Sequence, residues 1–120
     1  MLKERALFYY ESGCSCSESI LLATRDCHGR ITPEALSSVG AFTNGFGVGG
    51  FCCAVAAAVL VLGLFFPPQT AQQKRMILLC QVQRRFGSLQ CSILRQGCCC
   101  RCRELVGFVA EELEKLLLCR

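Results

Sequence analysis

The sequence predicts an all-α protein, a compact single-domain multi-helix bundle over residues 1–120 with one central apolar helix. Helix-capping signals recur along the chain, no alternation of apolar and polar residues indicates a strand hairpin, and residues 51–66 are apolar throughout. With 52% hydrophobic and 18% charged residues, the chain is too apolar to be disordered. Its length of 120 residues allows a core that does not depend on disulfides.

The first three helices are predicted from their starting residues. Ser15 and Glu18 form the capping box S-x-x-E, which begins the second helix. Thr32 followed by Pro33 supplies an N-cap and a proline at the first helical position. The helices expected along the whole chain cover residues 2–11, 15–29, 33–42, 51–66, 70–86, 88–95 and 101–118.

The apolar segment, residues 51–66, lies in a stretch without any charged side chain between Glu34 and Lys74. A membrane span needs about 20 apolar residues, so its length is borderline. The preceding residues are mostly glycine, which favours a loop, and the alanines at 54 and 56–58 suit close contact with other helices. We therefore expect the central helix of a bundle, with a membrane anchor as the less favoured interpretation.

The later helices have weaker start signals and a clear apolar face. Thr70 to Gln73 fits a second capping box, and Ser88 can cap a short helix. In the final helix, Glu111 and Lys115 have the spacing of a favourable i, i+4 pair. Its apolar stripe consists of Leu105, Val109, Leu113, Leu116 and Leu117.

Cysteine is the outstanding feature of the composition, with 12 residues in 120. Four of the seven predicted helices carry a cysteine near their start. These helices begin near residues 15, 51, 88 and 101. A helix N-terminus stabilises an anion and is expected to lower the pKa of a thiol, and the thiolate is both metal ligand and redox nucleophile. The candidate site residues are therefore Cys16, Cys52, Cys53, Cys91 and Cys102.

The other cysteines are less informative. Cys27 and Cys80 are expected to be small apolar fillers, because free cysteine is often buried. Cys14 precedes the Ser15 cap and is in a position to flank a site, and Cys119 is expected to be frayed and incidental. Residues 98–100 are consecutive cysteines in an expected turn, and the C-x-x-C that they form with Cys102 is a weak redox signal without a βαβ pattern.

Histidine and aspartate occur once each, as His28 and Asp26. A Ser-His-Asp arrangement for acyl transfer therefore has no foundation. His28, beside Gly29, is expected to be a helix C-terminal cap or a surface residue rather than a ligand. A structural zinc site normally has two close ligand pairs, and the spacings here do not supply them.

Charge and compartment limit the partners. Net charge is +4, with −1 over residues 1–66 and +5 over residues 67–120, but no aromatic residues are interleaved with the arginines, so nucleic-acid binding is not expected. No signal-peptide pattern occurs at the start, and consecutive cysteines do not suit a disulfide framework, so a reducing cytoplasm is the expected location. A membrane association is not favoured, and a homodimer stays open.

Four cysteine motifs occur in a fixed order. They are Gly13-x-x-Cys16, a glycine-rich loop with Cys52-Cys53-Ala54-x-x-Ala57, Phe86-Gly87-Ser88-x-x-Cys91, and Cys102-x-x-Leu105-Val106. In this order the sequence resembles the C_GCAxxG_C_C family of redox-active proteins, which is itself similar to the C-terminal region of split-Soret cytochromes, where an iron-sulfur cluster is bound.

The resemblance implies that the family's four cysteines fall on Cys16, on Cys53 or Cys52, on Cys91 and on Cys102. Two positions depart from the family pattern: Ala57 replaces the final glycine of GCAxxG, and Ser15 stands where asparagine usually precedes the first cysteine. The surplus cysteines are also unusual for the family.

Three functions compete at this point. The first is a cysteine-ligated iron-sulfur cluster, of the [2Fe-2S] type, that transfers electrons to a redox partner protein not identified by the sequence. The second is thiol–disulfide exchange without metal, for example between Cys53 and Cys91. The third is a non-catalytic protein, either a zinc or Cu(I) binder or a small membrane-anchored helical protein. An electron-transfer or accessory role is expected more than an enzyme with its own substrate.

Overall fold

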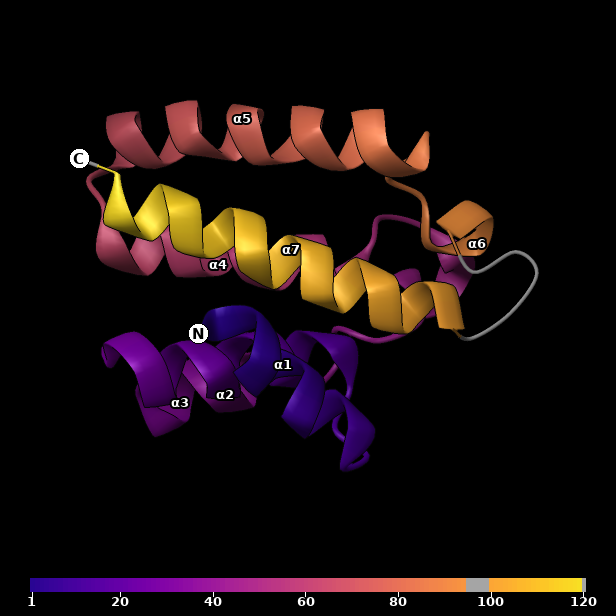
Figure 1. Cartoon of the computed structure of the whole chain (residues 1–120), viewed down its shortest axis with the longest axis horizontal. Coiled ribbons are helices and arrows are strands. Elements are labelled where there is room, and N and C mark those ends of the chain that lie inside the picture. Colours follow the sequence, from indigo (N-terminus) through magenta and orange to yellow (C-terminus); the bar gives the residue numbers. More distant parts are fainter. Residues whose placement is uncertain (95–99, 120) are drawn as a thin grey trace.

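The regular elements of the computed structural model are helices throughout residues 1–94 and 100–119, which are the residues that it describes (Figure 1). Outside the helices, these residues form one isolated antiparallel bridge, between Phe51 and Gln90. The all-α prediction is confirmed. The elements are α1 (Leu2–Glu11), α2 (Cys16–His28), α3 (Pro33–Ser38), the π-turn η1 (Gly45–Gly49), α4 (Cys53–Phe65), α5 (Pro68–Phe86), α6 (Cys91–Leu94) and α7 (Cys100–Leu118).

The helices pack in three layers (Figure 1). α4 and α7 form the middle layer, α5 covers one side of it, and α1 and α2 lie on the other side. The apolar helix predicted at the centre is α4, which packs against α2, α5 and α7, and α7 shares the central position because it contacts α1, α2, α4 and α5. The radius of gyration is 12.9 Å, as expected of a compact chain of this length.

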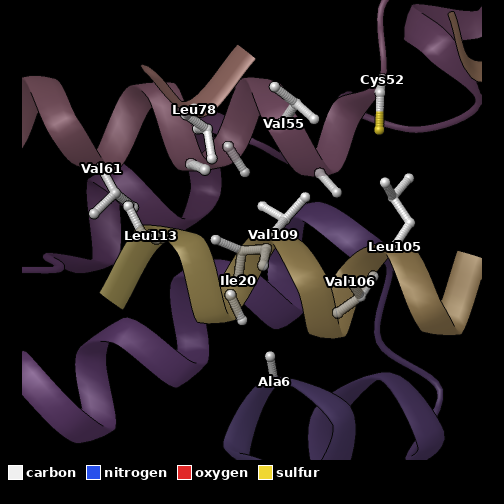
Figure 2. Packing of buried hydrophobic residues seen from close by; sticks show 14 of the residues in the cluster. Ala6, Ile20, Cys52, Val55, Val61, Leu78, Leu105, Val106, Val109 and Leu113 are labelled. Atoms are coloured by element: carbon white, nitrogen blue, oxygen red, sulfur yellow. The ribbon is translucent and has the colours of Figure 1, made fainter. Parts of the chain in front are cut away.

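The core is made of aliphatic side chains from these layers (Figure 2). Val55 and Val61 of α4, Leu78 of α5 and Val109 and Leu113 of α7 are all fully buried. Removing such a buried leucine side chain typically costs about 2–5 kcal/mol, so the packing of α4 on α7 is a main source of stability. None of the helices in the described part of the chain is both long and apolar enough to span a membrane.

The first half of the chain begins its helices where the sequence predicts. The Ser15 hydroxyl accepts from the Glu18 N–H at 3.2 Å, and the Glu18 carboxylate accepts from the Ser15 N–H at 3.1 Å, so the capping box is confirmed. Thr32 caps α3 through the Ala35 N–H at 3.1 Å. α3 ends at Ser38, before the predicted residue 42.

The start of α5 was placed wrongly by the second capping-box pattern. The helix begins at Pro68, with Pro67 as N-cap in an extended conformation, and Thr70 already lies inside it. Proline at the first helical position has its φ preset and loses no needed N–H, so the diproline begins the helix two residues before Thr70. The predicted Glu111–Lys115 pair is replaced by Lys115–Glu112 and Lys3–Glu111 ion pairs.

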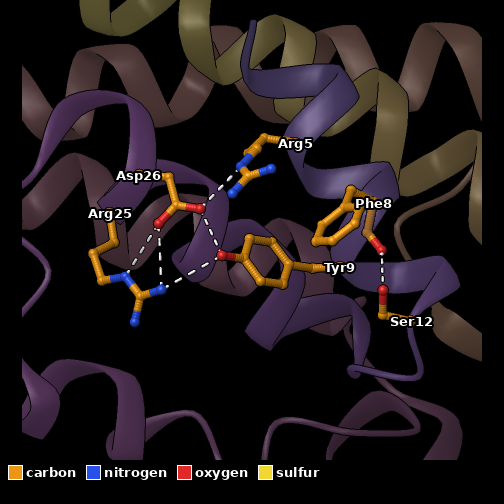
Figure 3. Close-up of polar contacts among 6 residues, drawn as sticks. All are labelled: Arg5, Phe8, Tyr9, Ser12, Arg25 and Asp26. Carbon is orange, nitrogen blue, oxygen red and sulfur yellow. Dashed lines mark hydrogen bonds and ion pairs between the residues drawn. The ribbon is translucent and has the colours of Figure 1, made fainter.

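A polar cluster on the surface fixes α1 against α2 (Figure 3). The Asp26 carboxylate accepts from the Arg5 guanidinium at 3.0 Å and from the Tyr9 hydroxyl at 2.5 Å. Arg25 pairs with the other carboxylate oxygen at 3.3 Å. The Ser12 hydroxyl donates to the Phe8 carbonyl at 2.8 Å and ends α1, directly before the segment that reaches the cysteine residues.

Candidate cysteine site

A cavity of about 500 Å³ lies at the end of the bundle where α2, α4 and α7 begin. Its wall contains all five predicted site residues and one further cysteine, Cys14. The cysteines of the wall are Cys14, Cys16, Cys52, Cys53, Cys91 and Cys102. We call this group the cysteine cavity.

The N-terminal side of the cysteine cavity is built by the turn between α1 and α2. The Cys14 N–H donates to the Tyr9 carbonyl at 3.1 Å, and Gly13 takes φ +106°, a conformation that suits glycine. The Ser15 capping box then holds Cys16 in the first turn of α2. In the sequence, only its position before the Ser15 cap indicated that Cys14 could flank the site.

The middle of the cysteine cavity is held by a short pairing of two distant segments. The Cys52 N–H donates to the Leu89 carbonyl at 2.8 Å, and the Cys91 N–H donates to the Gly50 carbonyl at 2.6 Å. These two backbone hydrogen bonds bring Cys91 beside the start of α4. Sequence patterns did not predict this pairing, because a single bridge leaves no periodicity.

Gly45 makes this pairing possible. Its φ is +58°, and a Cβ atom there would lie 2.4 Å from the Gly50 nitrogen and 2.8 Å from the Cys91 Cβ. Such distances are far below a normal van der Waals contact. The glycine-rich loop therefore serves close backbone packing next to the cysteine cavity.

The last wall segment is the first turn of α7. Cys102 is its third residue and is half-buried, and Leu105 one turn later joins Leu94 of α6 in the apolar part of the wall. Of the consecutive cysteines, Cys98 and Cys99 lie outside the described residues, and Cys100 is described only as the first residue of α7.

Burial dominates the electrostatics of the thiols. Burial is the largest of the causes that raise the pKa of Cys16 to about 12; the neighbouring Cys52 and Cys53 contribute to the rise, and the Ser17 N–H opposes it. Burial likewise raises the pKa of Cys52 to about 11, although the N–H groups of Val55 and Ala54 lower it. The predicted lowering of these thiol pKa values is wrong, because desolvation of the anion outweighs the helix N-terminus.

The donor atoms around the cysteine cavity are chemically uniform. Its charge-bearing candidates are thiols alone, and the remaining polar lining consists of Tyr10, Ser15, Thr43 and Asn44. Among the described side chains, those of residues 1–94 and 101–119, no three of histidine, cysteine, aspartate or glutamate are grouped so that they could hold a metal ion. The thiols of the wall are soft donors.

The residues assigned other roles lie elsewhere. Cys27 packs partly buried against the core as predicted, whereas Cys80 is exposed, so its assignment as a filler is wrong. Cys119 is exposed just after α7. His28 is neither a cap nor a surface residue: its side chain is 15% exposed and its Nε2 lies 3.3 Å from the Glu114 carboxylate.

A family model covers residues 14–116 and matches this chain under the description Putative redox-active protein (C_GCAxxG_C_C). The match begins at Cys14 and includes every cysteine that lines the cavity. The chain belongs to the C_GCAxxG_C_C family. Among curated proteins and solved structures, nothing matches the chain.

Proposed function

We propose that the cysteine cavity binds an iron-sulfur cluster of the [2Fe-2S] type and that the protein transfers electrons. Cys16, Cys52, Cys91 and Cys102 are the proposed ligands, one from each motif of the family. The observation that carries the proposal is the wall itself: six thiols from separate parts of the chain around one cavity, with no histidine or carboxylate among its described lining residues.

The donor set fits such a cluster. Iron-sulfur clusters are held by cysteine thiolates, and a cluster separates its ligands more widely than a single ion does. The N-termini of α2, α4 and α7 all face this end of the bundle, so their partial positive charges favour a group with net negative charge. When bound, the cluster supplies a reversible one-electron centre, and Leu94 and Leu105 keep water from that side of it.

The raised thiol pKa values favour this proposal over metal-free thiol exchange. A nucleophilic thiol must ionise near neutral pH, and burial holds the pKa of Cys16 at about 12. A cation inside the cavity removes that cost, because it replaces the thiol protons. Cluster loading is therefore expected to release protons, and in the protein without a cluster Cys16 and Cys52 are expected to be poor nucleophiles. Thiols are kept reduced in the cytoplasm, which is the location that we propose.

Cys52 is the better ligand of the vicinal pair. It is the N-cap residue of α4, and the N–H groups of Val55 and Ala54 act on its sulfur and lower its pKa. N–H groups near a ligand sulfur tune a cluster in the same way. The Cys53 thiol donates to the Phe51 carbonyl oxygen at 4.0 Å, so it has a partner within the chain.

The test is anaerobic purification of the full chain, followed by quantification of iron, acid-labile sulfide, zinc and copper per chain. Each proposed ligand is changed singly to serine, and Cys27→Ser is the matched control, because Cys27 is half-buried like Cys16 but lies outside the cavity. We expect about two irons and two sulfides per chain, reduced several-fold by each ligand substitution and unchanged in the control. Comparison of Cys52→Ser with Cys53→Ser decides the ligand at the second motif.

Three outcomes would contradict the proposal. A colourless protein without iron whose thiols titrate against a redox buffer would establish thiol exchange instead. Zinc or copper without sulfide would establish a soft-metal binder. Iron that is retained in every serine variant would show that the cluster lies elsewhere.

A further inference from the structure

A second hollow surface runs along the outer side of α4 and α5. One part, of about 680 Å³, is lined almost entirely by apolar side chains and extends from η1 to the middle of both helices. A second part, of about 260 Å³, continues it toward Phe66. The two parts share Val59 and Arg75, so they form one groove, which we call the α4/α5 groove.

The α4/α5 groove exposes one face of α4, the helix that the sequence predicts to be central. α4 turns Val59 and Leu60 toward the groove, half-buried, and Leu64 beside them is 42% exposed. On α5, Met76 is 50% exposed at the other wall. Contiguous apolar surface of this kind is uncommon on a free domain and marks an interaction site.

The shape of the α4/α5 groove suits a helix. Small residues from both helices, Ala56, Gly63 and Ala71, lie along its length and permit a close approach. α4 has 13 residues, which corresponds to about 20 Å at 1.5 Å per residue. A docked helix of three to four turns would therefore cover it, in the groove-binding mode that reads apolar residues at i, i+3, i+4 and i+7.

Charge identifies the kind of occupant. α5 carries Lys74, Arg75, Arg84 and Arg85 and no acidic residue, and no charged residue lies between Glu34 and Lys74. Lys74 is buried, and Arg84 and Arg85 line neither part of the groove, so its charge comes from the half-buried Arg75. No carboxylate in the described part of the chain pairs with Arg75. A second copy would bring another Arg75 and no carboxylate from these helices, and like charges in an apolar interface are costly.

We propose that the α4/α5 groove is the docking site for an amphipathic helix of a partner protein, with an apolar stripe flanked by glutamate or aspartate. A concave groove between two helices also favours a helix over an anionic membrane, which an exposed convex face would meet more easily.

The position of the groove connects it to the cysteine cavity. Phe42 and Phe51 line the groove, and the residues that follow them, Thr43 and Cys52, line the cavity. A helix in the groove would thus be separated from the cysteine cavity by the backbone of these neighbouring residues. That the docked protein exchanges electrons rests on the proposed function, whereas the docking itself does not.

The experiment uses the anaerobically purified full chain and two synthetic helical peptides, each of about 14 residues, a length matched to the groove. Both have leucines at helical spacing, one with flanking glutamates and the other with lysines at the same positions. Fluorescence anisotropy measures the binding of each peptide. We expect the glutamate peptide to bind at least about tenfold more tightly than the lysine peptide, with an affinity that falls as salt rises.

The matched variants are Met76→Glu and Ile77→Glu, neighbours on α5 that are each 50% exposed, of which only Met76 lines the groove. Met76→Glu and Arg75→Glu should weaken binding of the glutamate peptide at least about tenfold, and Ile77→Glu about twofold or less. Circular dichroism verifies that each variant is folded.

Equal binding of both peptides, no binding of either, or equal effects of Met76→Glu and Ile77→Glu would overturn the proposal. A homodimer that Met76→Glu dissociates would assign the groove to a second copy, and binding to phosphatidylglycerol vesicles but not to the peptide would assign it to a membrane. Iron and sulfide are measured on the same samples. Peptide binding without iron would retain the groove and reject the cluster, and iron without peptide binding would do the reverse.

Discussion

The two ends of the bundle are completed in different ways. At the end where α7 terminates, buried charged groups find partners within the chain: the Lys74 ammonium donates to the Leu116 and Cys119 carbonyls at 2.7 and 2.6 Å. The Glu114 carboxylate accepts from the Leu2 N–H at 3.3 Å and lies 3.3 Å from the His28 ring. At the opposite end, where α2, α4 and α7 begin, six thiols surround a cavity.

The ionisable groups at the two ends respond in opposite directions. Burial acts to raise the pKa of Glu114, but the Leu2 N–H, His28 and the amino-terminal charge hold it below its usual range. Burial raises the pKa of Cys16 and Cys52, and backbone N–H groups do not offset it. The first end stabilises its charge within the chain, whereas at the second end burial disfavours ionisation of the Cys16 and Cys52 thiols. This difference supports the proposal that the cluster binds at the second end.

The largest effect is expected at the loop that builds the cysteine cavity. In Gly45→Ala the new Cβ would meet the Gly50 nitrogen at 2.4 Å and the Cys91 Cβ at 2.8 Å. We expect a loss of about 3 kcal/mol or more in the free energy of unfolding, measured by urea denaturation, and less iron per chain because Cys91 is displaced.

Gly47→Ala is the matched control for Gly45→Ala. Gly47 also has a positive φ, +84°, but nothing lies within 4 Å of the added atom. It should cost only the strain of a left-handed alanine, about 1–2 kcal/mol. Equal losses in the two variants would show that the packing of Gly45 against Cys91 is unimportant.

The next effect concerns the closed end. Lys74→Met keeps much of the side chain volume and leaves the Leu116 and Cys119 carbonyls without their donor. We expect a loss of about 2–4 kcal/mol by urea denaturation, with the iron content of the folded protein unchanged. Gln73→Met, at an exposed neighbour, should stay within about 0.5 kcal/mol. Loss of iron in Lys74→Met would show that the two ends of the bundle are not independent.

The smallest effect near neutral pH comes from the thiols of the metal-free protein. Because the folded pKa values of Cys16 and Cys52 are raised above the unfolded value of 9.0, their contribution to stability is complete below pH 9 and declines toward pH 11–12. Chelated protein should therefore lose stability over that range in thermal melts, and Cys16→Ser should lose less.

Iodoacetamide at pH 8 should modify the exposed Cys80 and Cys119 before Cys16 and Cys52. Faster modification of Cys16 would contradict the burial argument.

The sequence was sufficient for features governed by local chemistry. The Ser15 capping box, the Thr32-Pro33 start and the apolar α4 follow from neighbouring residues, and they place Cys16 and Cys53 at helix starts. The resemblance to a cysteine family then selected the motif residues that the structure brings to one cavity. These are short-range signals with strong physical causes.

Features that depend on tertiary contacts could not be predicted. The burial of Lys74 follows from the position of the α7 C-terminus, and the pairing of His28 with Glu114 joins residues that are 86 positions apart. The thiol pKa values were predicted in the wrong direction, because a sequence shows which residues start a helix but not how deeply they are buried. The exposed face of α4 was missed for the same reason.

Hydrogen–deuterium exchange on the anaerobically reconstituted and on the chelated full chain compares both ends of the bundle in one measurement, and so tests whether a cluster binds in the cysteine cavity. We predict that iron and sulfide slow amide exchange around Cys16, Cys52, Cys91 and Cys102 and leave the amides of residues 112–119 unchanged. Unchanged exchange at the cysteine cavity, or slowing confined to the end of α7, would show that no cluster binds in the cysteine cavity.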